Sequence, residues 1–120
     1  MAAFRGTASA TLARRLRALV DADTAALAEP TRVELLSGAS SGDLKVLRRT
    51  ISALPIFYPS RDTWVLVERW VDRAVAAGER FGVVDLLIGA SATERGSQIW
   101  SLDHDFVRLA RLGLVRLYKP

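Results

Sequence analysis

The sequence predicts an α/β domain with a small, mostly parallel sheet flanked by helices. Short apolar segments typical of strands alternate along the chain with longer amphipathic segments typical of helices, and such alternation favours parallel pairing of the strands. The chain has 120 residues, 50% of them hydrophobic, which is enough to build one core. We therefore expect a single domain over residues 1–120.

The first half of the chain is expected to begin with a helix and to hold one short strand. Apolar residues recur at helical spacing over residues 12–20, and no strand is expected before them. The apolar run Ala25–Ala28 is compatible with a short buried strand. Two further helices are then expected, one that begins near Pro30 and ends at Gly38, and one that is N-capped by Asp43 and ended by Pro55.

The second half contains the longest expected helix, over residues 62–77. Trp64, Val67, Val71 and Val75 share one face of this helix, so we expect them to face the core. Trp100 is expected in the core as well, because it lies in a strand, whereas Trp70 is not assigned. The other expected elements are strands at residues 56–58, 98–101 and 114–118 and helices at residues 83–95 and 105–111.

Composition restricts the classes of function. The formal net charge is +4, and 15 of the 17 basic residues are arginine, which suits a polyanionic partner but equally the composition of a GC-rich genome. The sequence has no cysteine, which excludes disulfides and thiolate chemistry and makes a reducing cytoplasm the expected location. No apolar run has the length of a signal peptide or a membrane span, so no membrane partner is expected.

Three carboxylates, Glu34, Asp85 and Asp103, lie within or directly beside strongly apolar segments. Burying an ionised carboxylate without a partner costs several kcal/mol, so a shared cation would explain all three. Oxygen ligands suit Mg²⁺ or Mn²⁺, and a single histidine without cysteine disfavours zinc. The alternatives are that Asp85 caps its helix, that Glu34 is exposed on an amphipathic helix, and that Asp103 is a turn residue.

Three segments together resemble a known family. VELLSGA at residues 33–39, VDLLIGASA at residues 84–92 and SLDHDF at residues 101–106 resemble, in order and spacing, the second, third and fourth acidic motifs of PIN-domain ribonucleases of the VapC toxin type. The combination is more specific than any one motif. The resemblance extends from about Phe4 to the C-terminus.

The resemblance implies a metal-dependent endoribonuclease toxin of a type II toxin–antitoxin system, which cleaves RNA phosphodiesters with carboxylate-bound Mg²⁺ or Mn²⁺. Glu34, Asp85 and Asp103 correspond to catalytic metal ligands, and Asp105 is a weaker candidate ligand. Ser101 corresponds to a residue that steadies the site. The implied partners are an RNA substrate, a cognate antitoxin that lies along the groove beside the site, and a second copy of the chain in a homodimer.

The N-terminus departs from the family pattern. In the family a strand that ends in an acidic motif similar to Val-Asp-Thr-Ser precedes the equivalent of Phe4, whereas here Met1-Ala2-Ala3 stands in that place. We therefore expect the first metal-binding aspartate and the N-terminal strand to be missing. A mis-assigned start and a truncated copy are the favoured explanations, and a strand from elsewhere in this or a second molecule is the third.

The incomplete acidic set leaves a second hypothesis open. The chain would then be a catalytically inactive PIN remnant that only binds an antitoxin or forms dimers. A small basic nucleic-acid binder is a third hypothesis, but it does not explain carboxylates inside apolar segments. His104, the only histidine, lies between two acids and is expected to be an exposed turn residue rather than a catalytic one.

Overall fold

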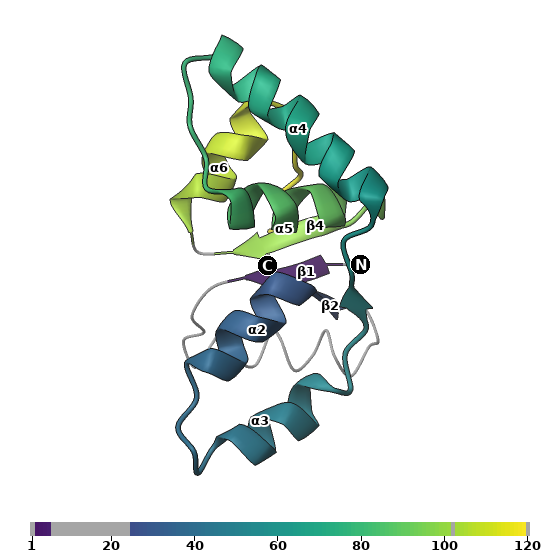
Figure 1. Cartoon of the computed structure of the whole chain (residues 1–120), viewed down its shortest axis with the longest axis vertical. Helices are drawn as coiled ribbons and strands as arrows, with labels where there is room; N and C mark the ends of the chain where they lie inside the picture. Colours follow the sequence, from purple (N-terminus) through teal and green to yellow (C-terminus); the bar gives the residue numbers. More distant parts are fainter. Residues whose placement is uncertain (1, 6–24, 102, 120) are drawn as a thin grey trace.

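The computed structural model describes residues 2–5, 25–101 and 103–119, and strands and helices are interspersed along it as expected for an α/β fold (Figure 1). The strands are β1 (Ala2–Arg5), β2 (Ala25–Ala28), β3 (Ile56–Phe57) and β4 (Gln98–Ser101). The helices are α2 (Glu29–Ser37), α3 (Leu44–Ile51), α4 (Arg61–Ala76), α5 (Val83–Glu94) and α6 (His104–Arg111). The helix expected over residues 12–20 lies outside the described part of the chain.

The four strands form one sheet in the order β3-β2-β1-β4, and β1 pairs parallel with both of its neighbours. The register sets Ala2 opposite Gln98 and Arg5 opposite Ser101, so β1 and β4 end at the same level. The pair between β2 and β3 is parallel too. The predicted α/β fold with a small parallel sheet flanked by helices is therefore confirmed.

The expectation that the N-terminal strand is missing is wrong, because Ala2–Arg5 takes the central position between β2 and β4. Without a strand there, the facing backbone groups of β2 and β4 would lack hydrogen-bond partners. A four-residue extended segment supplies those partners through its backbone. The acidic motif is not restored with the strand, because Ala2-Ala3-Phe4-Arg5 contains no carboxylate.

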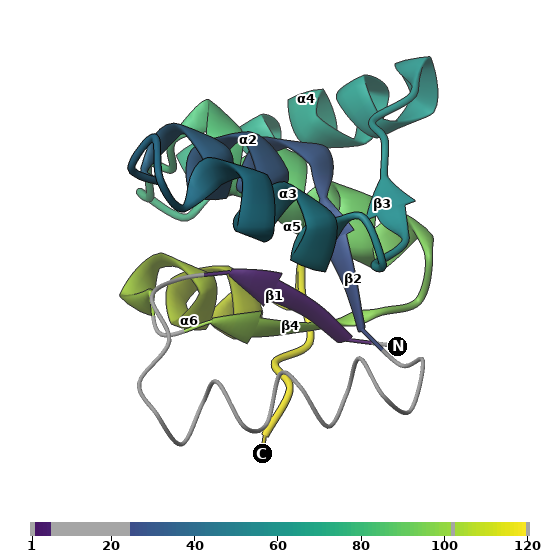
Figure 2. The same cartoon turned by 90° about the horizontal axis from the view of Figure 1, so that it is seen from below.

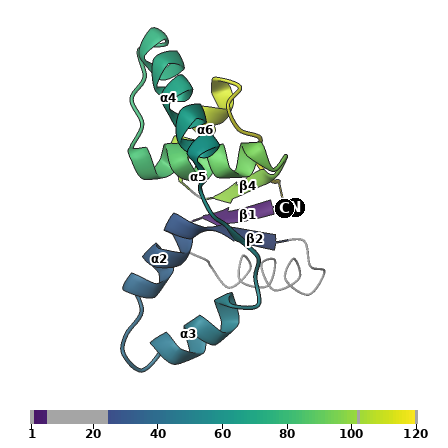
Figure 3. The same ribbon diagram turned by 45° about the vertical axis from the view of Figure 1, so that its right-hand side comes forward.

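Helix α5 is the central helix of the fold. Its residues from Leu86 to Ala92 are all buried, and it contacts β2, β4, α2, α4 and α6. Figure 2 shows α2, α3, α4 and α5 on one side of β1 and β4, with the C-terminus on the other side. Along the long axis of the molecule, α2 and α3 lie at one end and α4 and α6 at the other, with the strands between them (Figure 3).

Helix α4 presents a different face to the core from the one expected. Trp64, Val71 and Val75 are exposed, whereas Trp70 is only 4% exposed, so the predicted core face is wrong except at Val67. The buried set is Thr63, Val67, Trp70 and Ala74, which also recurs at helical spacing. Periodicity allows both faces, and the bulk of the Trp70 ring against α5 selects the second. Trp100 is 2% exposed, as predicted.

Two smaller expectations are also corrected. The segment at residues 114–118 forms no strand but a single parallel bridge between Ile99 and Leu117, in which the Tyr118 N–H donates to the Ile99 carbonyl at 2.7 Å. Asp43 precedes α3 but does not cap it with its side chain; its carboxylate accepts a hydrogen bond from the Ser40 hydroxyl at 2.9 Å instead. Within the described residues, no helix combines the length and apolarity needed to cross a membrane.

Candidate metal centre

Three elements bring acidic residues to the carboxyl edge of the sheet. Strand β4 ends at Ser101, and Asp103 follows it as the N-cap of α6. Asp85 stands in the first turn of α5. The carboxyl ends of parallel strands and the first turns of the following helices meet at the same edge, where open α/β sheets bind their ligands.

Asp85, Asp103 and Asp105 form a compact group. Each can offer a carboxylate oxygen such that the three oxygens lie within 4.8 Å of one another, and all three residues are partly buried. Like charges this close repel one another, and a divalent cation relieves the repulsion while accepting oxygen ligands. The donor set of this group therefore fits Mg²⁺ or Mn²⁺.

The segment between β4 and α6 is fixed by two hydrogen bonds. The Asp103 N–H donates to the Ser101 hydroxyl at 2.9 Å, and the Asp105 N–H donates to the Asp103 carboxylate at 3.0 Å. Asp103 therefore serves as the N-cap of α6 and as a member of the acidic group at once, since a carboxylate has two oxygens. Asp103 can therefore be a turn residue and a metal ligand at the same time.

Asp85 is held by the helix that carries it. Gly82, rather than Asp85, takes the N-cap position of α5. The buried residues that follow Asp85 fix α5 against the sheet and thus fix the place of the carboxylate. The first turn of a helix also carries positive partial charge, which favours a carboxylate there.

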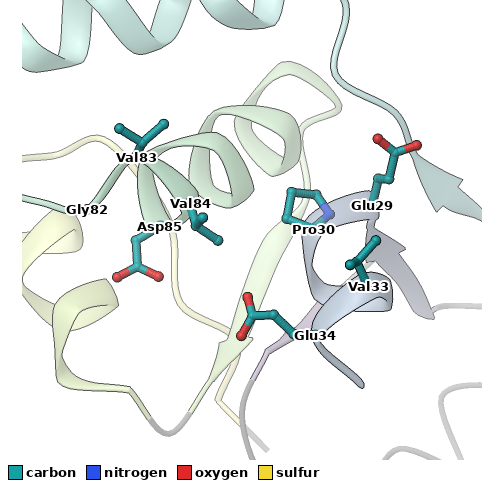
Figure 4. Close-up of a pocket in the computed structure, with 8 residues that line it drawn as sticks. All are labelled: Glu29, Pro30, Val33, Glu34, Gly82, Val83, Val84 and Asp85. Atoms are coloured by element: carbon teal, nitrogen blue, oxygen red, sulfur yellow. The ribbon is translucent and has the colours of Figure 1, made fainter. Parts of the chain in front are cut away.

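Glu34 is exposed and is not one of the three acids within 4.8 Å of one another. It lines an open cleft of about 630 Å³ together with Asp85, and the two carboxylates approach this cleft from opposite walls (Figure 4). The remaining lining is largely apolar, and Val33, Val83 and Val84 in it are exposed. The structure thus places Glu34 and Asp85 on the same face of the molecule.

The sequence analysis did not identify Arg108, which contacts the acidic group from α6. Its guanidinium Nη1 donates to the Asp105 carboxylate at 2.9 Å, and it also forms an ion pair with Glu79. The hydrogen bond to Glu79 and then that to Asp105 raise the pKa of Arg108 above its ordinary value, so the group is always charged. The three-residue spacing of Asp105 and Arg108 on a helix was the available signal. His104 is exposed, as predicted.

Comparison with known proteins identifies the fold independently. The profile of the PIN domain family matches residues 1–112. A search of curated proteins found no match.

Among solved structures, the crystal structure of VapBC2 from Rickettsia felis bound to a DNA fragment from their promoter contains a similar chain. The TM-score is 0.78 at 18% identity, with 98% of each chain covered. FitAcB from Neisseria gonorrhoeae gives a TM-score of 0.73 at 17% identity, covering 100% of this chain and 98% of that one. VapBC-5 from Mycobacterium tuberculosis, a member of the VapBC family of toxin-antitoxin systems, gives 0.66 at 21% identity, covering 80% and 82%. At these identities the similarity concerns the fold.

Proposed function

The chain belongs to the PIN domain family, and we propose that it is the metal-dependent endoribonuclease toxin of a type II toxin–antitoxin system. The observation that supports this proposal most directly is the group formed by Asp85, Asp103 and Asp105 at the carboxyl edge of the sheet. The shared fold with chains from VapBC and FitAcB structures supports the toxin–antitoxin part. The excess of arginine suits an RNA substrate.

The proposed roles follow from where the side chains lie. Asp85 and Asp103 would hold Mg²⁺ or Mn²⁺, with Asp105 as an additional ligand, and Glu34 would act from the opposite wall of the cleft. Ser101 would position Asp103, because its hydroxyl accepts a hydrogen bond from the backbone N–H of Asp103. When bound, the cation supplies activation of a water molecule and neutralises charge on the phosphate.

The apolar part of the cleft supports a protein partner beside the site. Val33 is 58% exposed and Val83 is 60% exposed, next to the carboxylates of Glu34 and Asp85. A segment of the cognate antitoxin that combines apolar side chains with a basic one would complement both features of this cleft. We further propose that the chain forms a homodimer and is located in the cytoplasm.

One observation favours the second candidate, a catalytically inactive PIN remnant that retains antitoxin or dimer contacts. Strand β1 ends at the same level as β4 but contains no carboxylate. A metal site with fewer carboxylates binds divalent cations more weakly. Absence of RNA cleavage by the folded chain at any concentration of Mg²⁺ or Mn²⁺ would support this candidate.

The test is cleavage of a single-stranded RNA by the purified chain with Mg²⁺ or Mn²⁺. We expect Asp85→Asn to lower the cleavage rate by about 100-fold or more, because it removes a charge that holds the cation at the phosphate. Asp72→Asn is the matched control, since Asp72 is exposed on α4 and lies outside the acidic group. Cleavage that is unchanged by Asp85→Asn, or that needs no divalent cation, would reject the proposed site.

A further inference from the structure

We propose that Arg108 is a positioning residue that holds the two halves of the acidic group at their spacing. One half is Asp103 and Asp105 at the start of α6, and the other is Asp85 in the first turn of α5. The consequence for cation binding rests on the proposed function, whereas the structural role of Arg108 does not.

Through separate atoms of its guanidinium, Arg108 contacts Asp105 in the first half and the segment that leads into α5, the helix that carries the second half. On its own helix, Nη1 donates to Asp105 Oδ1 at 2.9 Å. Toward the segment between α4 and α5, Nε donates to Glu79 Oε2 at 3.1 Å and Nη2 donates to the Arg80 carbonyl at 2.9 Å. The guanidinium carbon also lies 4.5 Å from the centre of the Phe81 ring, within the range of a cation–π contact.

These contacts hold the segment that leads into the first turn of α5. Glu79, Arg80 and Phe81 directly precede Gly82, the N-cap of α5, and Asp85 stands three residues further along. A segment tied to α6 by Arg108 therefore sets the first turn of α5 relative to Asp105. The planar guanidinium is suited to this task because it donates in several fixed directions at once, which an ammonium group cannot do.

Arg108 also orients the carboxylate of Asp105. Because Nη1 engages Oδ1, rotation of the carboxylate is restricted. Residues that orient metal ligands in this way commonly change metal affinity by about 10- to 100-fold when they are replaced. The two effects of Arg108 on cation affinity oppose each other. Orienting Asp105 strengthens cation binding, whereas the positive charge of the guanidinium by itself weakens it.

The experiment compares Arg108→Gln with Arg111→Gln, which removes the same charge from an exposed position of the same helix. Positioning predicts that Arg108→Gln weakens Mn²⁺ binding by about 10- to 100-fold in calorimetry, whereas Arg111→Gln changes it less than about 2-fold. Arg108→Lys keeps the charge but not the fork, and we expect it to restore binding only in part. Binding that is unchanged or tighter in Arg108→Gln would overturn the positioning role.

Amide hydrogen exchange of the metal-free protein separates this inference from the proposed function. We expect Arg108→Gln to accelerate exchange in residues 80–85 by about 10-fold while leaving β4 unchanged, because the loop loses its contacts with α6. Equal exchange would overturn the inference whether or not the protein cleaves RNA. Conversely, the proposed function is rejected if the wild-type chain neither binds Mn²⁺ nor cleaves RNA. The hydrogen-exchange experiment then still tests the structural role of Arg108.

A second variant guards against loss of folding in Arg108→Gln. Glu79→Gln leaves the contact between Arg108 and Asp105 in place but weakens the ion pair that ties the loop to α6. We expect the same acceleration of exchange at residues 80–85, with a smaller amplitude. If exchange at residues 80–85 is unchanged in Glu79→Gln but about 10-fold faster in Arg108→Gln, the contacts of Arg108 with the Arg80 carbonyl and Phe81 hold the loop. That result still supports the role of Arg108.

Discussion

Gly89 lies on α5 at the point where the Trp70 ring from α4 packs against it. A Cβ atom at Gly89 would lie 2.9 Å from Trp70 Cζ3 and 3.1 Å from Val115 Cγ1. Both neighbours are buried in the core, since Trp70 is 4% exposed and Val115 is 6% exposed. The absence of a side chain at residue 89 is therefore what admits the largest buried ring of α4.

We predict that Gly89→Ala lowers the free energy of unfolding by about 1 to 3 kcal/mol, the usual cost of overpacking a filled core. Urea denaturation followed by circular dichroism measures it. Gly42→Ala is the control, because among the described residues nothing lies within 4 Å of a Cβ atom there. Equal unfolding midpoints for the two variants would show that Trp70 moves without cost.

Helix α4 begins with a capping box. The Thr63 N–H donates to the Ser60 hydroxyl at 3.3 Å, and the Ser60 N–H donates to the Thr63 hydroxyl at 2.9 Å. Two N–H groups at the start of the helix are thereby satisfied, and Thr63 is fully buried. The box fixes where α4 starts.

We predict that Ser60→Ala destabilises the protein by about 1 kcal/mol, because the capping hydroxyl is lost. A domain of this size should then melt about 3 to 6 °C lower. The control is Ser52→Ala at the end of α3, where the hydroxyl donates to the Arg49 carbonyl and caps no N–H group. Indistinguishable melting temperatures for the two variants would count against the capping role.

At the scale of the whole molecule, the fold gathers acids from distant parts of the chain. Asp85 and Asp103 belong to different elements, α5 and the start of α6, and converge only when these two helices pack against each other. An ion that binds this group therefore binds the folded chain better than the unfolded one. Cation binding and folding are linked.

We predict that Mn²⁺ at 100 times its Kd stabilises the fold by about 2.7 kcal/mol, seen as a higher melting temperature. Asp103→Asn should abolish this increase while retaining the cap of α6, since asparagine caps as well as aspartate. Asp72→Asn should keep the increase. An equal increase for the wild type and Asp103→Asn would exclude Asp103 from the site.

Much of the fold was predictable from the sequence because the relevant signals are local. Apolar spacing and the positions of proline and glycine identified β2, β4 and five helices to within a few residues. The same locality made Asp103 and Asp105 predictable as neighbours, since they lie in one turn. Asp85 was found because a carboxylate among apolar residues needs a compensating partner.

Other features depended on contacts between distant segments, which no local pattern records. Ala2–Arg5 has no strand signature of its own and becomes a strand because β2 and β4 leave a place between them. Trp70 rather than Trp64 enters the core because Gly89 leaves room opposite it. Arg108 reaches Glu79 across 29 positions of sequence.

The sequence by itself thus determined most of the elements, though not β1 or the fate of residues 114–118, and it determined which carboxylates are available. Both follow from interactions between residues a few positions apart. Only the tertiary structure decided that Asp85 joins Asp103 and Asp105, while Glu34 faces them across a cleft. That arrangement depends on how α2, α5 and α6 pack around the sheet, and packing is a property of the assembled core rather than of any one segment.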